Sequence, residues 1–155
     1  TWSTSLDLLF WSSVRVYGMV LPGMRARKWG RIINILSTAA VEPVPTLATS
    51  SVLRAALAAY SKLTAWEVSK EGITINSVMP SGFMTTRTQE LIADTAKRRG
   101  SSHEEVLREL EQTLPLGRFM EPIELGRFVA FLASDEAAGM TGALLPFDGG
   151  AGKSI

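Results

Sequence analysis

Ser37 closes a short run of aliphatic residues, at a position where chemistry could occur. Residues 31–36 read "RIINIL", and Ser37 and Thr38 follow directly. Ligands of open parallel α/β sheets bind beyond the carboxyl ends of the strands. The Ser37 hydroxyl is therefore a candidate for contacting a substrate oxygen. The competing interpretation is a turn or helix-capping serine, which describes most serines after strands.

The segment after Ser37 carries two polar side chains four positions apart. Ser50 lies thirteen positions after Ser37 and Arg54 four positions later, inside an alanine-rich segment. Positions i and i+4 share one face of a helix, so the two side chains would point the same way. Tyr60 lies six positions after Arg54, on a different face of the helix from Ser50 and Arg54, and is interpreted as a packing residue.

The sequence offers few other groups for catalysis or metal binding. It has no cysteine, which excludes disulfides, thiolate metal sites and thiol nucleophiles. His103 is the one histidine, so we predict no metal site. A serine hydrolase would need His103 as its base. However, Ser102 followed by Glu105 is a capping pattern, which predicts that His103 lies exposed in a first helical turn.

Alternating strand and helix patterns are expected to position these residues. Strands are predicted at 31–36, apolar on both faces, at 73–79, ended by Pro80, and at 143–147. Helices are predicted at 5–27, 47–70 and 121–134, and in the charged segment 85–113. "LPGM" breaks the apolar pattern near the end of the first, Gly72 ends the second, and "RRGSS" interrupts the charged segment. Pro122 lies in the first turn of the last helix. This alternation predicts an α/β fold with a parallel sheet flanked by helices.

Length and composition narrow the function classes. The 155 residues are enough for one domain with a core. A net charge of +1 gives no strong attraction to nucleic acid or anionic membranes, and no stretch approaches the roughly 18 to 20 apolar residues of a membrane span. We expect no nucleic-acid or membrane partner and a cytoplasmic location. The chain begins without Met inside a helical pattern, so a fragment of a larger protein is also expected.

Four stretches together carry a resemblance to a known family. They are "GRIINILS", a long helix, "GITINSVMPSGFMTT" and "LPLGRFMEPIELGRFVAFLASDEAAGMTGALLPFDGG", in that order along nearly the whole chain. The last is the most specific, because "LGR", "P-x-E-[IL]", "V-x-F-L-A-S-D", "TG" and "DGG" are hard to obtain together by chance. The sequence resembles the C-terminal part of the short-chain dehydrogenase/reductases, most closely the 3-oxoacyl-carrier-protein reductases.

The resemblance implies the C-terminal part of a doubly wound Rossmann-type sheet. Residues 1–155 would form a single partial domain that lacks the N-terminal dinucleotide-binding half, because no glycine-rich loop opens a helix just after a strand. A full-length parent would use NAD or NADP to reduce a small-molecule carbonyl or oxidise an alcohol. The 155-residue chain itself is not expected to hold either cofactor firmly.

The resemblance also implies roles for the spaced polar residues. Ser37 matches the serine that orients the substrate carbonyl. Ser50 and Arg54 stand where the family has its proton-donating tyrosine and the lysine that holds the nicotinamide ribose. Phe10 aligns with the asparagine of the preceding helix. The related halohydrin dehalogenases also have an arginine at the position of that lysine, but they retain the tyrosine.

A second segment resembles the family's "PG-x-x-x-T" cofactor loop. Pro80 matches, Ser81 stands where glycine is usual, Phe83 lies within the loop, and Thr85 matches the threonine that contacts the nicotinamide amide or the phosphates. These residues form the predicted cofactor-binding set together with Arg54. The competing interpretation is a strand-ending turn followed by a helix cap.

Two functions therefore stay open. The first is an oxidoreductase with a degenerate triad that is inactive as this fragment. The second is a non-catalytic assembly protein, because helices 5–27 and 47–70 correspond to the family's dimer-forming pair. Either way we predict a homo-oligomer through these helices. Asp148 and the glycines after it are expected to shape the C-terminal turn at an oligomer contact.

Overall fold

A three-stranded parallel sheet forms the centre of the molecule. The computed structural model describes residues 1–153. The strands β1 (Gly30–Ile35), β2 (Ile73–Pro80) and β3 (Leu144–Phe147) lie in the order β1-β2-β3, and both pairs are parallel. The predicted strands and their parallel arrangement are confirmed.

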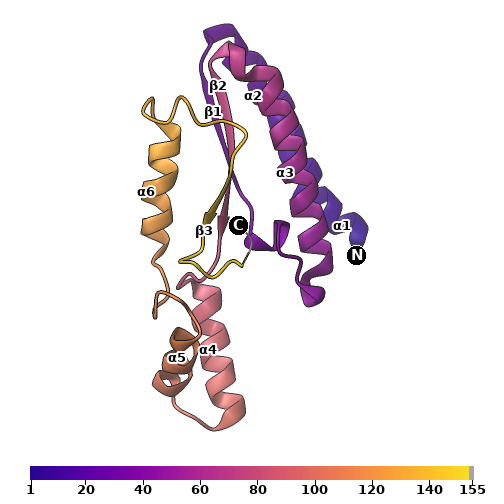
Figure 1. Cartoon of the computed structure of the whole chain (residues 1–155). Coiled ribbons are helices and arrows are strands. Elements are labelled where there is room, and N and C mark those ends of the chain that lie inside the picture. The colour runs from indigo at the N-terminus through magenta and orange to yellow at the C-terminus, as the bar shows by residue number, and fades with distance from the viewer. Residues whose placement is uncertain (154–155) are drawn as a thin grey trace.

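Helices flank the sheet on two sides (Figure 1). The chain opens with α1 (Trp2–Leu6), a π-helical turn (Asp7–Trp11) and α2 (Ser12–Arg27), which run without interruption beside α3 (Ala48–Val68). On the other side lies α6 (Pro122–Ala133), which contacts β1. The helix begins three residues before the predicted start because the Thr1 side chain caps it by accepting a hydrogen bond from the Thr4 amide. No helix within residues 1–153 is long and apolar enough to cross a membrane.

A helical hairpin projects beyond the carboxyl ends of the strands (Figure 1). It consists of α4 (Thr86–Arg99) and α5 (His103–Gln112), separated by Gly100 at a φ of 67°. The capping box of Ser102 and Glu105 is confirmed, with Oγ to amide and amide to carboxylate distances of 3.1 and 2.9 Å. His103 is exposed, as predicted.

Two prolines lie within regular elements. The predicted helix end at residue 27 is confirmed, since α2 continues through Pro22 of "LPGM", where the apolar pattern breaks, to Arg27. The packing of this helix against α3 through Tyr17 and its neighbours outweighs the hydrogen bond that a proline removes. Pro80 belongs to β2 as its last residue, paired with Phe147, where a missing N–H costs least.

The turn between α3 and β2 requires a glycine. After α3, a 3₁₀ turn (Ser69–Glu71) leads to Gly72 at a φ of 74°. A Cβ built on Gly72 would stand 2.3 Å from the Lys28 carbonyl oxygen, so both the left-handed conformation and the close approach exclude a side chain. The predicted helix end at Gly72 is confirmed.

The prediction that β1 is apolar on both faces needs correction at Asn34. Asn34 is buried, and its side-chain amide nitrogen lies within hydrogen-bonding distance of Tyr17 Oη (2.7 Å), Ser61 Oγ (3.0 Å) and Ser77 Oγ (3.2 Å), which share its two hydrogens. Burial raises the pKa of the Tyr17 phenol within this cluster. Ile35 is 47% exposed because β1 is an edge strand with only β2 beside it in the described chain. The buried polar cluster satisfies groups that would otherwise be costly inside the core.

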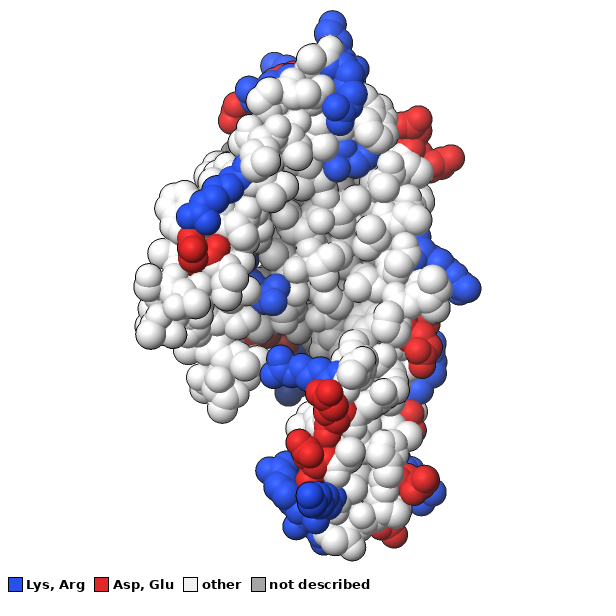
Figure 2. All heavy atoms as spheres, turned by 180° about the vertical axis from the view of Figure 1, so that it is seen from behind, with Lys and Arg blue, Asp and Glu red and all other residues white. Residues whose placement is uncertain are grey.

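The back of the molecule carries a hollowed surface with few charges, and Lys, Arg, Asp and Glu side chains lie mainly around its rim (Figure 2). The outer edge of β1 has no strand beside it among residues 1–153, and native proteins usually cover or protect such edges.

Candidate active site

Ser37 ends the strand segment and begins a tight turn. Its backbone is extended, and its Oγ accepts a hydrogen bond of 3.2 Å from the Ala39 amide at the start of the 3₁₀ turn Thr38–Ala40. The serine therefore does cap a turn. A hydroxyl has two acceptor lone pairs and one donor hydrogen, so this cap leaves the O–H able to donate to a substrate oxygen. The capping and substrate-binding roles are compatible.

Ser50 and Arg54 share one face of α3, as their spacing predicts. Arg54 Nε donates to Ser50 Oγ at 3.1 Å, and Arg54 Nη1 donates to the Ile35 carbonyl oxygen at 3.3 Å. The guanidinium thus joins α3 to the end of β1, two residues before Ser37. Burial lowers the pKa of Arg54, because desolvation disfavours the charged form and both recorded acceptors are neutral.

The segment after β2 forms both a turn and a cap. The Ser81 amide donates to the Phe147 carbonyl oxygen, which extends the contact between β2 and β3 past Pro80. Thr85 is the N-cap of α4 and accepts from the Thr88 amide at 3.2 Å. The Phe83 ring stacks on Phe147 at 6.0 Å between centroids. The structural roles expected for a turn and a cap are present, and they do not test a cofactor role.

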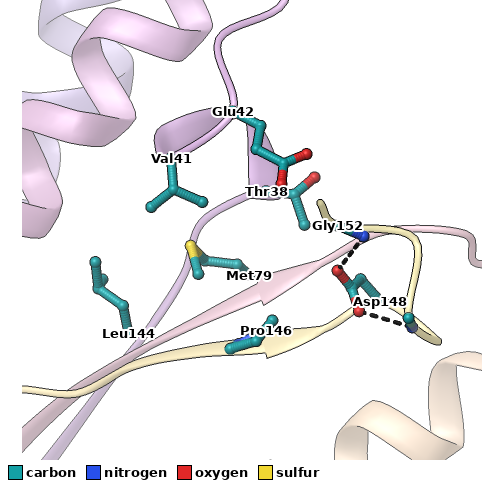
Figure 3. A pocket seen from close by; sticks show the side chains of 9 residues that line it. Thr38, Val41, Glu42, Met79, Leu144, Pro146, Asp148 and Gly152 are labelled. Atoms are coloured by element: carbon teal, nitrogen blue, oxygen red, sulfur yellow. Dashed lines mark hydrogen bonds between the residues drawn. The ribbon is translucent and has the colours of Figure 1, made fainter. Parts of the chain in front are cut away.

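Beside the turn that follows Ser37 lies a cavity of about 440 Å³. Figure 3 shows its lining, which comes from the segments after the carboxyl ends of β1 and β3 and from the ends of β2 and β3. The lining residues are Thr38, Val41, Glu42, Met79, Leu144, Pro146, Asp148, Gly150 and Gly152. Ser37, Ser50 and Arg54 are not among them. The cavity begins one residue beyond Ser37, where a substrate that reaches Ser37 could extend.

Two carboxylates shape the polar side of this cavity. Asp148 accepts from the Gly150 amide (3.0 Å) and from the Gly152 amide (2.9 Å), and Glu42 accepts from the Lys153 amide. The prediction that Asp148 shapes the C-terminal turn is confirmed, while its place at an oligomer contact stays a prediction. Sequence reasoning missed Glu42. The available signal was its position in the loop after the first strand, on the sheet edge where ligands bind.

Several other predicted roles can be placed. Tyr60 packs inside the chain, with its ring centroid 5.5 Å from Tyr17 and 5.9 Å from Phe10. Phe10 lies in the π-helical turn and packs on a buried cluster that includes Leu36 and Met79. His103 lies on α5 in the hairpin, where it lines a surface depression with Met84 and Leu107, so a Ser37–His103 pair has no support. Among residues 1–153, no three acidic or histidine side chains gather in a group that could hold a metal ion.

Comparison with known proteins identifies the class that this fold and site define. A family model described as enoyl-(acyl carrier protein) reductase matches residues 1–152. The chain is 31% identical over 150 residues to a D-beta-hydroxybutyrate dehydrogenase of Cupriavidus necator, covering 96% of this chain and 58% of that protein. It is 36% identical over 149 residues to a 3-oxoacyl-[acyl-carrier-protein] reductase of Pseudomonas aeruginosa, covering 96% of this chain and 54% of that protein.

The solved structure of L-sorbose reductase from Gluconobacter frateurii, complexed with NADPH and L-sorbose, superposes with a TM-score of 0.93 at 33% identity. The match covers 99% of this chain and 59% of that one. The fold is thus α/β with Rossmann-like neighbours. The chain belongs to the short-chain dehydrogenase/reductase family, whose relatives here are oxidoreductases. It spans between half and three fifths of the length of these relatives.

Proposed function

We propose that the chain is the C-terminal part of an NAD(P)-dependent oxidoreductase that reduces a small-molecule carbonyl or oxidises an alcohol. The observation that carries this proposal is the contact of Arg54 with the Ile35 carbonyl oxygen, which brings the Ser50–Arg54 pair to the end of β1, the strand that Ser37 follows. The relatives support it, since one is an L-sorbose reductase solved with NADPH and L-sorbose, and another is a D-beta-hydroxybutyrate dehydrogenase by its name. Ser37 follows β1 and Ser81 follows β2, at the strand ends where ligands of such sheets bind.

The residues present fit only one end of a dinucleotide. Arg54 would lie near the nicotinamide ribose, and the loop with Pro80, Ser81, Phe83 and Thr85 would face the nicotinamide amide or the phosphates. In residues 1–153, no glycine-rich loop opens a helix after a strand, so the pyrophosphate has no cradle of backbone N–H groups. We therefore propose that the 155-residue chain alone binds NAD or NADP weakly. The cofactor supplies the hydride when bound.

The chain's own groups would act on the oxygen of the substrate. Ser37 donates its hydroxyl hydrogen to that oxygen while its lone pair keeps the Ala39 cap. Ser50 keeps its own O–H for donation, because its contact with Arg54 uses an acceptor lone pair. However, a serine is a much weaker acid than tyrosine, and Arg54 carries its proton permanently. Proton delivery through Ser50 and a water would be slow.

Calorimetry and a turnover assay test this proposal together. We expect the 155-residue chain to show no micromolar binding of NADPH and no NADPH oxidation with ketones. A longer protein that joins this chain to a dinucleotide-binding half should bind NADPH and turn over slowly, and Ser37→Ala should abolish that turnover. Micromolar NADPH binding by the 155-residue chain, or full activity of Ser37→Ala, would contradict the proposed assignment.

A non-catalytic assembly role is the second candidate. The outward face of α2 and α3 exposes large apolar side chains, with Met19 79% and Trp66 68% exposed. Such a face supports a homo-oligomer through residues 5–27 and 47–70. Light scattering at micromolar concentration should show an oligomer that Met19→Glu with Trp66→Glu converts to monomer, whereas the matched pair Leu91→Glu with Ile123→Glu on other exposed positions should not. A monodisperse wild-type monomer would contradict this candidate.

A further inference from the structure

Arg54 has more hydrogen-bond donors than recorded partners. A guanidinium carries five N–H groups. Nε donates to Ser50 Oγ and Nη1 to the Ile35 carbonyl oxygen, and these are the hydrogen bonds of the Arg54 side chain within residues 1–153. Three N–H groups on Nη1 and Nη2 therefore stay available to a ligand. Because Arg54 is half-buried, water solvates its charge less well than that of an exposed arginine.

The carboxylates on the elements around Arg54 bond to other arginines. None of the ion pairs within residues 1–153 includes Arg54. Asp7, in the π-helical turn that packs on α3, pairs with Arg15. Glu67, near the other end of α3, pairs with Arg25. The positive charge of Arg54 thus has no recorded counter-ion in the described chain.

The hydroxyl groups near Arg54 are also free to donate. Ser50 Oγ accepts from Arg54 Nε, and no acceptor for its own hydrogen is recorded among residues 1–153. Ser37 Oγ accepts from the Ala39 amide and likewise keeps its hydrogen. The contact of Arg54 with the Ile35 carbonyl oxygen brings the first two groups to the end of β1, the strand that Ser37 follows. This surface is positive and rich in donors, which is what an oxyanion requires.

We propose that Arg54 and Ser50 bind a carboxylate group of the substrate, so that the oxidoreductase acts on a keto acid or a hydroxy acid rather than on an uncharged compound. This inference rests on the proposed oxidoreductase function and names its substrate class. A guanidinium presents its donors in a planar fork that matches two carboxylate oxygens, whereas a lysine amine is a point charge. Ser37 contacts the carbonyl or hydroxyl oxygen of the same molecule.

The position of Arg54 keeps this carboxylate apart from the acidic cavity beside Ser37. That cavity is lined by Glu42 and Asp148, and neither Arg54 nor Ser50 is part of its lining. The substrate carboxylate would therefore lie on the α3 side of Ser37. Partial burial strengthens its attraction to Arg54, because a lower local dielectric screens the two charges less than water does.

Amide NMR of the ¹⁵N-labelled 155-residue chain at low salt tests the site without requiring turnover. The probes are levulinate, a keto carboxylate, and levulinamide, an uncharged ketone of nearly the same size. We expect levulinate to shift the amide signals of Ser50 and Arg54, and levulinamide to bind there about tenfold more weakly, because hydrogen bonds to charged groups are the stronger ones. Arg54→Met should weaken levulinate binding to the level of levulinamide. Arg98→Met removes the same charge from the exposed face of α4 and is the matched control, which should leave levulinate binding unchanged.

Substrate preference in a longer protein with a dinucleotide-binding half gives a second readout. The ratio of kcat/KM for levulinate to that for levulinamide cancels any effect on cofactor binding or folding that both substrates share. We expect Arg54→Met to lower this ratio about tenfold. Arg54→Lys should lower it less, since lysine keeps the charge but loses the planar fork. An unchanged ratio would assign Arg54 to the cofactor or the fold and overturn the inference.

The outcomes separate this inference from the proposed function. Levulinamide binding as tightly as levulinate, no response to either probe, or an equal loss of levulinate binding in Arg98→Met would each overturn the carboxylate site. Inorganic phosphate that displaces levulinate more effectively than acetate does would overturn the carboxylate class in favour of a phosphate. Selective levulinate binding, combined with no NADPH oxidation in the longer protein, would retain the site and overturn the oxidoreductase. A well-dispersed spectrum of Arg54→Met shows that a loss of binding is not a loss of fold.

Discussion

Two arginines contact opposite ends of β1, and their surroundings differ. Arg31, near the start of the strand, is 6% exposed and pairs with Asp135 at 3.1 Å, donates to the carbonyl oxygens of Ser134, Gly30 and Gly72, and lies over the Trp29 ring at 4.9 Å. Arg54, at the other end, meets Ser50 and one carbonyl oxygen, and burial lowers its pKa.

The difference separates a structural arginine from a candidate functional one. Arg31 links β1 to the end of α6 through the Ser134 carbonyl oxygen and Asp135. These partners satisfy both its charge and its hydrogen-bond donors. Arg54 is partly desolvated without a recorded carboxylate among residues 1–153. Uncompensated charge in a partly buried position is typical of functional sites. The first three of the four predictions below test this contrast, and the fourth adds a surface ion pair for comparison.

The largest effect is expected from restoring the proton donor at the Arg54 end. In a longer protein with a dinucleotide-binding half, Ser50→Tyr with Arg54→Lys should raise the rate of carbonyl reduction by about 10²–10⁴-fold, the usual contribution of a general acid. Steady-state NADPH oxidation measures the gain. Ser51→Tyr with Arg54→Lys is the matched control and should give no gain. An unchanged rate in the first variant would show that Ser50 does not occupy the acid's position.

Removing the Arg31 side chain should mainly lower the stability of the fold. Arg31→Ala should lower the free energy of unfolding by about 2–3 kcal/mol, because hydrogen bonds to a charged group contribute about 1.5–3 kcal/mol. Urea denaturation monitored by tryptophan fluorescence measures the loss. Asp135→Asn should cost less than about 1 kcal/mol, since the Asp135 side chain is 83% exposed. Equal losses for both variants would contradict a role based on the carbonyl contacts.

Replacing Arg54 should change the free energy of unfolding much less than replacing Arg31. Arg54→Met removes two hydrogen bonds to neutral acceptors but also removes a partly buried charge, so the two effects offset each other. We expect a change in the free energy of unfolding within about 1 kcal/mol of zero, measured by urea denaturation beside Arg31→Ala. A loss as large as that of Arg31→Ala would identify Arg54 as structural and remove the contrast.

The smallest expected effect concerns Arg118, an exposed arginine four residues before α6. Arg118 donates to both Glu124 carboxylate oxygens at 2.8 Å and, with the Glu121 amide, lowers the pKa of Glu124 to about 2. A depressed carboxylate pKa stabilises the fold above the unfolded value of about 4.3. This contribution is lost as the pH falls from there through about 2. Carboxyl-carbon NMR of Glu124 should show this low midpoint, and Arg118→Gln should raise it towards the ordinary value.

Much of the fold followed from local patterns. The aliphatic runs that became β1 and β2, the glycine that ends the turn at Gly72 and the capping box at Ser102 all depend on neighbours within a few positions. The spacing of Ser50 and Arg54 on one helix face was likewise predictable, because an α-helix fixes which residues share a face. These features needed no knowledge of the rest of the chain.

What the sequence could not predict were the partners brought from far along the chain. Arg31 meets Asp135 across 104 positions, and Glu42 meets the Lys153 amide across 111. In the sequence, Asn34 is a polar interruption in an apolar strand. In the structure, it is buried beside Tyr17, Ser61 and Ser77. Local propensity determines helices and strands because their hydrogen bonds are short-range. The charge and hydrogen-bond balance of each arginine and carboxylate depends on which distant segments pack against it, and only the tertiary structure decided that.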